Sequence, residues 1–141
     1  MSNNSATPSR ILYPMIRVCN IDRSLKFYVN ALGMRELRRE SFKAGRFTLL
    51  FVGYGEEANG TVLELTYNWD EQHYEHGNRY GHLALEVKDI YKACERLASM
   101  GVIIAREPGP MAFAADESAE RETIAFIEDP DGYRIELIER R

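Results

Sequence analysis

The sequence predicts an α+β fold made of two similar modules in tandem. ILYPMIRV at 11–18 is followed 69 positions later by YGHLALEV at 80–87, and VLELT at 62–66 matches RIELI at 134–138 with an offset of 72. Units this small do not close a core alone, so we expect them to pack about a pseudo-two-fold axis. Such packing would form a concave mixed-sheet cleft lined by equivalent positions of both modules.

The first module is expected at residues 10–69. Alternation of side chains along 11–18 predicts a strand, and a helix follows in which Asp22 is the candidate N-cap and Gly33 the stop. The apolar positions of this helix are Leu25, Tyr28 and Leu32. RFTLLFVGYG and TVLELTYNW then read as two strands separated by a glycine-bearing turn.

A linker at 70–79 leads to the second module, expected at 80–141, which repeats this order. GHLALEV predicts a strand, and the following helix has Asp89 as its cap and Gly101 as its stop. ETIAFIE and YRIELIE are the last two strands, and DPDG at 129–132 joins them with turn residues.

Composition indicates an ordered globular chain rather than a disordered or membrane-spanning one. The chain has 141 residues, 45% of them hydrophobic, and a formal net charge of −4 with both signs interspersed, so we expect no nucleic-acid or membrane partner. Cys19 and Cys94 suit a reducing compartment better than a disulfide framework. The polar start MSNNSATPS lacks a signal-peptide pattern, which predicts a flexible tail at 1–9 on a cytoplasmic protein.

Three acid or imidazole side chains stand at duplicated positions of the strands. Position 64 corresponds to 136, and both are glutamates within apolar runs, while His82 corresponds to Tyr13. One imidazole with two carboxylates suits a divalent metal such as Zn²⁺ or Ni²⁺, which would also relieve the repulsion between the carboxylates. The alternatives are a hydrogen-bonded core histidine and solvated strand glutamates.

Five stretches of the chain carry a resemblance to a known family. They are MIRVCNIDRSLKFYVNALGM, LLFVGYG, LELTYNW, YGHLALEV and IAFIEDPDGYRIELIE, and they cover nearly all of residues 11–139. The chain resembles the glyoxalase I (lactoylglutathione lyase) family, in the vicinal-oxygen-chelate, or glyoxalase/bleomycin resistance/dioxygenase, superfamily. The resemblance implies one glyoxalase-like domain at 10–141 built from two βαβββ modules.

The resemblance also implies an activity and a set of site residues. Glu64, His82 and Glu136 would bind one divalent metal ion, Ni²⁺ or Zn²⁺, together with the residue at position 13. Glu136 would move a proton between adjacent carbons of the glutathione–methylglyoxal hemithioacetal, through an enediolate, to give S-lactoylglutathione; Glu64 could serve the opposite face. The site would lie between the subunits of a homodimer, with Tyr13 and Glu64 from one subunit and His82 and Glu136 from the other.

Two further residues match family contacts to the glutathione cosubstrate. Arg17 matches a residue that binds the γ-glutamyl carboxylate, and Asn68 matches another glutathione contact. The alternatives are an arginine paired with a nearby acid at the surface and an asparagine that closes a turn.

Tyr13 departs from the family pattern, which has histidine or glutamine at this position. A phenol with a pKa near 10 must lose its proton to be a good ligand, which costs about 4 kcal/mol at neutral pH. Three outcomes stay open: a phenolate ligand, a three-residue site completed by water, or a weakened site.

The segment MAFAADESAE at 111–120 is the second departure, because it is longer than its family counterpart and has acids in place of a lysine. Arg121 could replace the missing positive charge, and Met111 and Phe113 could form an apolar lid. His73 and His76 suggest either a second metal site or a solvated linker. These departures keep open a paralogue that uses another thiol, or one that binds a small molecule without turnover.

Overall fold

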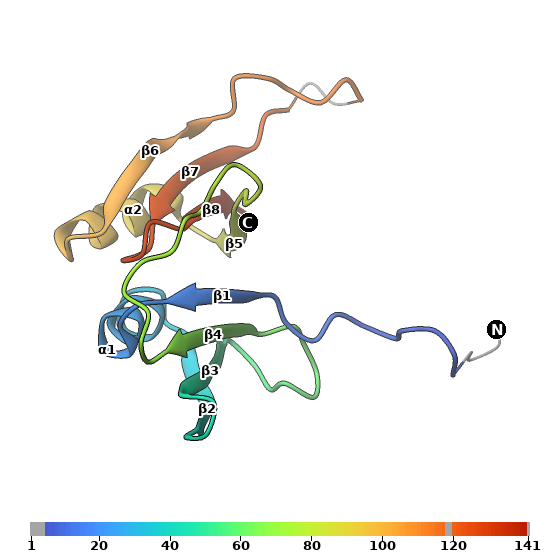
Figure 1. Cartoon of the computed structure of the whole chain (residues 1–141). Helices are drawn as coiled ribbons and strands as arrows, with labels where there is room; N and C mark the ends of the chain where they lie inside the picture. Colours follow the sequence, from blue (N-terminus) through green and yellow to red (C-terminus); the bar gives the residue numbers. More distant parts are fainter. Residues whose placement is uncertain (1–4, 118–119, 141) are drawn as a thin grey trace. The chain divides into compact units, whose positions relative to one another are not determined.

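The computed structural model describes residues 5–117 and 120–140, and the chain divides into two compact units, Met1–Tyr74 and Glu75–Arg141 (Figure 1). The tail at 1–4 and the loop residues 118–119 lie outside the described residues. Each unit has the element order βαβββ, which confirms the duplication and the module that the family resemblance implies.

Unit 1 forms a four-stranded mixed sheet beside one helical segment. Its elements are β1 (Met15–Val18), α1 (Ile21–Leu25), η1 (Lys26–Ala31), β2 (Arg35–Phe42), β3 (Phe47–Gly53) and β4 (Leu63–Asn68). The strand order is β1-β4-β3-β2, with β1 parallel to β4 and the other pairs antiparallel. The fully buried side chains of this unit include Val18, Tyr28, Leu50, Phe51 and Leu65.

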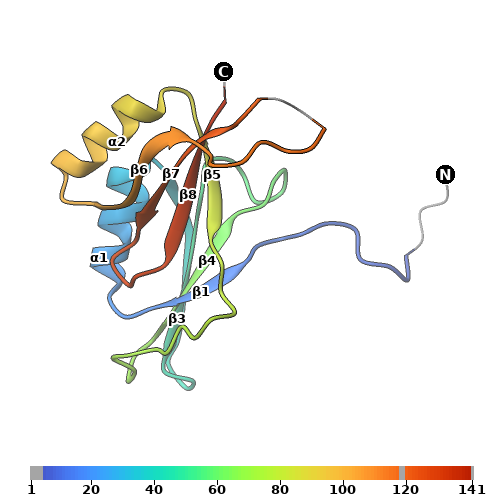
Figure 2. The ribbon, with the colours of Figure 1, turned by 90° about the horizontal axis from the view of Figure 1, so that it is seen from above.

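Unit 2 repeats this topology. Its elements are β5 (Leu83–Val87), α2 (Ile90–Ser99), β6 (Ile103–Pro110), β7 (Thr123–Glu128) and β8 (Arg134–Glu139). The order β5-β8-β7-β6 again has one parallel pair, β5 with β8. Helix α2 packs on β6, β7 and β8, and Figure 2 shows it on one side of these strands. The apolar core beneath it includes Ile90, Ile127, Ile135 and Leu137.

The helix ends follow local sequence signals, with one correction. The predicted cap Asp22 is wrong, because the Asn20 side chain accepts the hydrogen bond from the Arg23 N–H at 2.9 Å and Asp22 lies in the first turn. There its charge still favours the helix N-terminus. Asp89 caps α2 as predicted. Both predicted stops, Gly33 and Gly101, have positive φ angles of 76° and 86°, which glycine adopts without strain.

The strand predictions missed β2 and β6, which lie at the edge of each sheet opposite β1 and β5. Each pairs on one side only, β2 with β3 and β6 with β7. β2 reads RELRRESF and β6 contains two prolines, so neither shows the apolar alternation of a half-buried strand. The first strand is also shorter than the predicted 11–18, since β1 begins at Met15.

Two other sequence expectations concern cysteines and membrane helices. Cys94 is buried, which raises the pKa of its thiol, and Cys19 is half-buried. Within the described ranges, no helix is long and apolar enough to cross a membrane.

Candidate functional site

Unit 2 brings His82 and Glu136 into direct contact. His82 lies immediately before β5, Glu136 lies on the neighbouring strand β8, and the His82 Nε2 atom is 3.1 Å from Glu136 Oε1. The Glu136 side chain is 14% exposed and that of His82 is 42% exposed, so the pair opens to solvent on the imidazole side. We call His82 and Glu136 the second half-site.

Phe126 supports the second half-site from the adjacent strand β7. It is the cross-strand partner of Glu136, so the two side chains share one face of the sheet. Its ring meets the His82 ring edge-on, with centroids 5.1 Å apart and an interplanar angle of 77°. The Arg134 guanidinium lies 5.1 Å from the Phe126 centroid.

Unit 1 carries the matching arrangement around Glu64, on β4. The Glu64 side chain is nearly buried, and its Oε2 accepts a hydrogen bond from the Thr66 hydroxyl at 2.8 Å. Glu64 pairs across the sheet with Met15 of β1 on one side and with Phe51 of β3 on the other. Tyr13 packs edge-on against Phe51, with centroids 5.0 Å apart. We call Tyr13 and Glu64 the first half-site.

The two half-sites are equivalent in register and in packing. Phe51 pairs across the sheet with Glu64 as Phe126 pairs with Glu136. Each phenylalanine contacts the ring of the residue two positions before the glutamate's other cross-strand partner, which is Met15 in unit 1 and Ala84 in unit 2. Tyr13 therefore occupies the place that His82 holds in unit 2. Sequence reasoning missed Phe51 and Phe126, although both stand on the strand preceding the glutamate strand of the repeat.

A divalent metal fits the donor atoms of the second half-site. Metal–nitrogen and metal–oxygen bonds of roughly 2 Å place two ligands of one ion about 3 Å apart, which the His82–Glu136 separation of 3.1 Å matches. Within each unit, however, the described residues include no group of three or more His, Cys, Asp or Glu side chains that could hold a metal. Neither half-site is a complete ligand set of those residue types.

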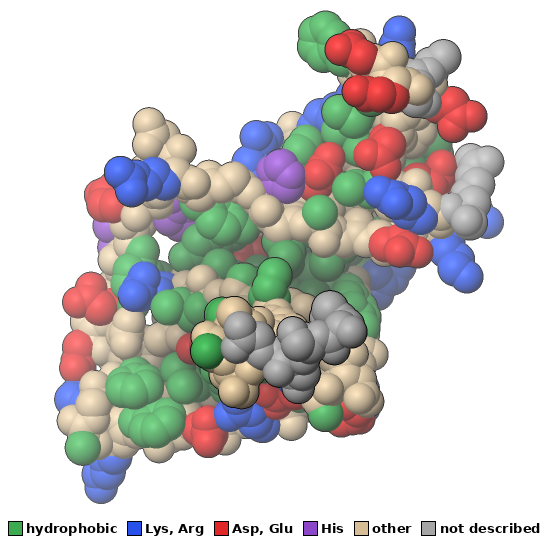
Figure 3. All heavy atoms as spheres, turned by 90° about the vertical axis from the view of Figure 1, so that its right-hand side faces the viewer, with side chains coloured by type: hydrophobic (Ala, Val, Ile, Leu, Met, Phe, Trp, Pro, Cys, Tyr) green, Lys and Arg blue, Asp and Glu red, His purple; other side chains and the backbone are tan. Residues whose placement is uncertain are grey.

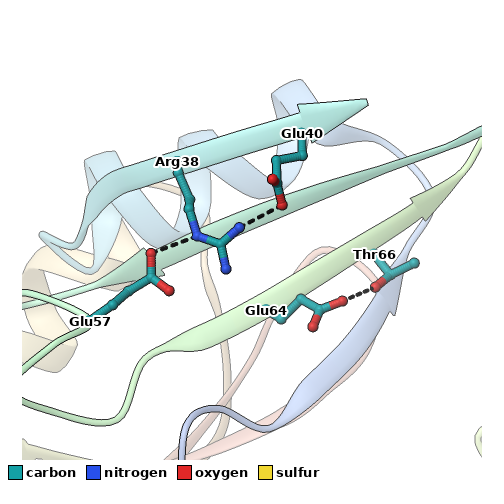
Figure 4. A network of polar contacts seen from close by, with 5 residues as sticks. All are labelled: Arg38, Glu40, Glu57, Glu64 and Thr66. Atoms are coloured by element: carbon teal, nitrogen blue, oxygen red, sulfur yellow. Dashed lines mark hydrogen bonds and ion pairs between the residues drawn. The ribbon is translucent and has the colours of Figure 1, made fainter. Parts of the chain in front are cut away.

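A polar network adjoins the first half-site on the same face of the sheet (Figure 4). Arg38 of β2 pairs across the sheet with Phe51, and its guanidinium lies 3.6 Å from the centre of that ring. Its Nε donates to Glu57 at 2.7 Å and its Nη1 to Glu40. These carboxylates, Glu57 foremost, raise the pKa of Arg38. No sequence motif singled out Arg38.

The two predicted glutathione contacts lie on unit 1. Arg17 is an exposed residue of β1 whose cross-strand partner is Thr66, on the same strand as Glu64. Asn68 ends β4, and its side-chain amide donates to the Tyr74 hydroxyl at 2.9 Å. Neither position contradicts a role in substrate binding, and their assignment stays a prediction.

The remaining candidate segments lie in unit 2 and before it. In the 111–120 loop, Phe113 is 81% exposed, and the described acids Asp116, Glu117 and Glu120 are exposed as well. Acidic side chains gather at the top of Figure 3, where this loop lies. His76 is half-buried and stacks on Tyr133 with centroids 4.3 Å apart, so this end of the linker is packed rather than solvated.

Comparison with known proteins gives a consistent family. The model of the Glyoxalase/Bleomycin resistance protein/Dioxygenase superfamily matches residues 10–137. A lactoylglutathione lyase of Neisseria meningitidis serogroup B is 53% identical over 132 residues, covering 94% of this chain and 91% of the relative. A probable lactoylglutathione lyase of Synechocystis is 49% identical, with 92% and 94% covered.

Solved structures agree with the sequence comparisons. Glyoxalase I from Zea mays is 39% identical with a TM-score of 0.84; the match covers 93% of this chain but 44% of the maize chain, so this chain spans under half of that protein. The trypanothione-dependent glyoxalase I of Leishmania major is 39% identical with a TM-score of 0.78, and 94% and 87% of the two chains are covered. The chain therefore belongs to the glyoxalase/bleomycin resistance protein/dioxygenase superfamily.

Proposed function

We propose that this chain is a lactoylglutathione lyase, which isomerises the hemithioacetal of methylglyoxal and glutathione to S-lactoylglutathione. The observation that carries the proposal is the contact of 3.1 Å between His82 and Glu136, with a register-equivalent arrangement around Glu64 in the other unit. Relatives named lactoylglutathione lyase, at 53% identity over nearly the whole chain, support the same reaction.

Glu64, His82 and Glu136, with Tyr13 as the fourth candidate, would hold one divalent ion, Ni²⁺ or Zn²⁺. The two half-sites would combine in a homodimer, with Tyr13 and Glu64 from one subunit and His82 and Glu136 from the other. When bound, the metal would stabilise the negative charge that develops on the substrate oxygens during proton transfer. Glutathione enters the reaction as the thiol of the substrate.

Glu136 is the better placed of the two glutamates to act as the base. One oxygen of Glu64 is already engaged by the Thr66 hydroxyl, which holds that carboxylate in one orientation. Glu136 has His82 as its described partner, and its side chain keeps partial solvent access. Its carboxylate would take the proton from one substrate carbon and return it to the adjacent carbon. Glu64 would then act mainly as a ligand.

Arg17 and Asn68 would bind the glutathione part of the substrate. Arg17 shares a sheet face with Thr66, its cross-strand partner, and therefore with Glu64 two residues earlier. A guanidinium at this place would pair with a substrate carboxylate through charge-assisted hydrogen bonds. The amide of Asn68, now bonded to Tyr74, offers a further donor at the end of the same strand.

The test is metal content and isomerase rate for the native chain, Tyr13→His and Tyr13→Phe, each loaded with Ni²⁺ or Zn²⁺. If the native chain is fully active and Tyr13→Phe is less active, the phenol is a ligand of the metal. Equal activity of the native chain and Tyr13→Phe indicates a three-residue site completed by water. The proposal would be refuted if the native chain showed no metal uptake and no turnover and Tyr13→His restored both. That result would favour a paralogue that binds a small molecule without turnover.

A second candidate keeps the reaction but changes the thiol. The 111–120 loop presents exposed acids, which would repel a glutathione carboxylate, and one similar structure is of a trypanothione-dependent enzyme. Rates with hemithioacetals of glutathione and of trypanothione, measured at equal concentrations, separate the two candidates. Turnover with trypanothione but not with glutathione selects the second.

A further inference from the structure

We infer that Arg38 is a positioning residue for Tyr13, which it holds on the Glu64 face of the unit 1 sheet through two separate routes. The first route runs through the ring of Phe51, and the second through Glu57 and the N-terminal segment. The inference rests on the proposed function only in taking Tyr13 as part of the site. All of its contacts lie within unit 1.

The first route consists of two contacts to the Phe51 ring, one from Arg38 and one from Tyr13. The Arg38 guanidinium lies 3.6 Å from the Phe51 ring centre, and Tyr13 meets the same ring edge-on at 5.0 Å and 73°. Phe51 is itself fully buried and forms the cross-strand pair with Glu64. A cation over one aromatic ring and an edge-on contact from another both favour one ring orientation. Arg38 thereby limits where the Tyr13 ring can settle.

The second route ties down the chain that precedes Tyr13. Arg38 Nε donates to the Glu57 carboxylate at 2.7 Å, and the Glu57 backbone carbonyl accepts from Arg10 Nη2 at 3.0 Å. From Ile11 onward, the N-terminal segment runs alongside residues 61–64. Its carbonyl groups accept hydrogen bonds in turn: Ile11 from Thr61 at 3.1 Å, Leu12 from Val62 at 3.2 Å and Pro14 from Glu64 at 3.0 Å.

Tyr13 needs this support because β1 begins only at Met15. Tyr13 and Pro14 precede the strand, and a phenol oxygen lies further from its backbone than an imidazole nitrogen does. A small rotation of the backbone or ring therefore displaces the phenol oxygen by more than it would displace an imidazole nitrogen. If either route is lost, we expect the Tyr13 hydroxyl to occupy a wider range of positions.

The histidine in the equivalent place of unit 2 has a different support. Arg106 pairs with Phe126 in register as Arg38 pairs with Phe51, yet the cation over the Phe126 ring is Arg134, at 5.1 Å rather than 3.6 Å. The Arg106 guanidinium donates instead to backbone carbonyl groups, among them Gly109 and Ile124 at 2.9 Å each. The close arginine–phenylalanine stack with carboxylate anchors thus accompanies the half-site that carries the tyrosine.

The experiment is a double-mutant cycle on Arg38 and Tyr13, read as Zn²⁺ affinity by competition with a chelating dye. Arg38→Met keeps the length but removes the charge and both carboxylate contacts, and we expect Zn²⁺ binding to weaken about tenfold, as for loss of a residue supporting a ligand. Arg38→Lys should restore part of the affinity. Arg39→Met is the matched control, because Arg39 is the next residue of β2, is exposed, and pairs with Glu36 at 3.0 Å.

The decisive comparison is made in the Tyr13→Phe background. If Arg38 acts through Tyr13, then Arg38→Met has little further effect once the phenol oxygen is gone, so the two losses are non-additive. Additive losses would overturn the inference. An unchanged affinity of Tyr13→Phe alone would instead remove Tyr13 from the metal site, so failure of the proposed site and failure of the Arg38 inference give different results.

Glu57→Gln tests the second route without touching the Phe51 stack, and it is expected to weaken Zn²⁺ binding by less than Arg38→Met does. Circular dichroism and thermal unfolding verify that each variant is folded.

A direct readout is the near-ultraviolet difference absorbance of a metal-bound phenolate on adding Zn²⁺. This signal should be present in the native chain, reduced in Arg38→Met and retained in Arg39→Met; an undiminished signal in Arg38→Met would contradict the role.

Discussion

His82 Nε2 lies 3.1 Å from Glu136 Oε1, which places an imidazole and a carboxylate of two neighbouring parallel strands at the spacing of two ligands on one ion. The same strand geometry puts Tyr13 and Glu64 on one sheet face in the other unit. The duplicated backbone thus presents two similar half-sites that differ in one donor group, a phenol in place of an imidazole. That difference decides how the site would bind metal.

Glu136→Gln should lower the isomerase rate constant by at least about 100-fold, because an amide cannot accept the substrate proton. Metal content should fall much less, since the amide oxygen can still coordinate. Steady-state kinetics of the metal-loaded enzyme measure the effect, with Glu95→Gln on α2 as the control for removal of a surface charge. A nearly normal rate would transfer the role of base to Glu64.

Thr66→Val should weaken Zn²⁺ binding by about 10- to 100-fold, because it removes the hydroxyl that orients the Glu64 carboxylate at 2.8 Å. Valine has nearly the shape of threonine, so packing is preserved. Dye competition measures the affinity. Thr48→Val is the control, since this buried hydroxyl on β3 accepts from the Trp69 indole N–H at 2.9 Å and does not touch Glu64; equal losses in both variants would argue against the orienting role of Thr66.

Asp129→Ala should destabilise the protein by about 2 kcal/mol, because two backbone N–H groups lose their acceptor. Asp129 is buried, and its Oδ1 accepts from the N–H groups of Asp131 and Tyr133 at 2.8 Å each, in the turn between β7 and β8. Urea unfolding gives the free-energy difference, with Asp116→Ala in the exposed loop as the control. A change no larger than that of the control would show that water replaces these bonds.

Tyr54 should make stability depend on pH in the alkaline range. Partial desolvation raises the pKa of Tyr54 above its ordinary value of 10.0, although 58% of the residue is exposed, and its hydroxyl donates to the Leu32 carbonyl at 2.7 Å. Because the folded state favours the neutral phenol, this stabilisation is fully present below pH 10 and is lost as the pH rises through the folded-state pKa.

The check is the unfolding free energy of the native chain and Tyr54→Phe across the alkaline range. The difference between them should shrink as the pH rises above 10, since only the native chain has a phenol to ionise at this place. Tyr91→Phe on α2 is the control, because Tyr91 is about as exposed as Tyr54, at 53% against 58%. A constant difference between native chain and Tyr54→Phe would rule out the burial effect.

The duplication, the helix stops and the three acid or imidazole positions could be predicted from sequence because each has a local cause. Apolar alternation marks a strand that has one face in the core, and glycine marks a helix end where φ must be positive. The cap was misplaced by two residues because Asn20 and Asp22 are both good acceptors, and only backbone φ and ψ decide between them. β2 and β6 were missed because charged residues and prolines replace the apolar alternation, and their place in the sheet is decided by pairing with β3 and β7.

The sequence by itself determined that the chain repeats a strand–helix–strand–strand pattern and that Glu64, His82 and Glu136 stand at duplicated positions, because periodicity and spacing are properties of the chain alone. Only the tertiary structure decided that Phe51 separates Arg38 from Tyr13 and that Thr66 engages Glu64. These contacts join residues of different strands and of the N-terminal segment. Their formation depends on sheet register and side-chain packing, which no local pattern encodes.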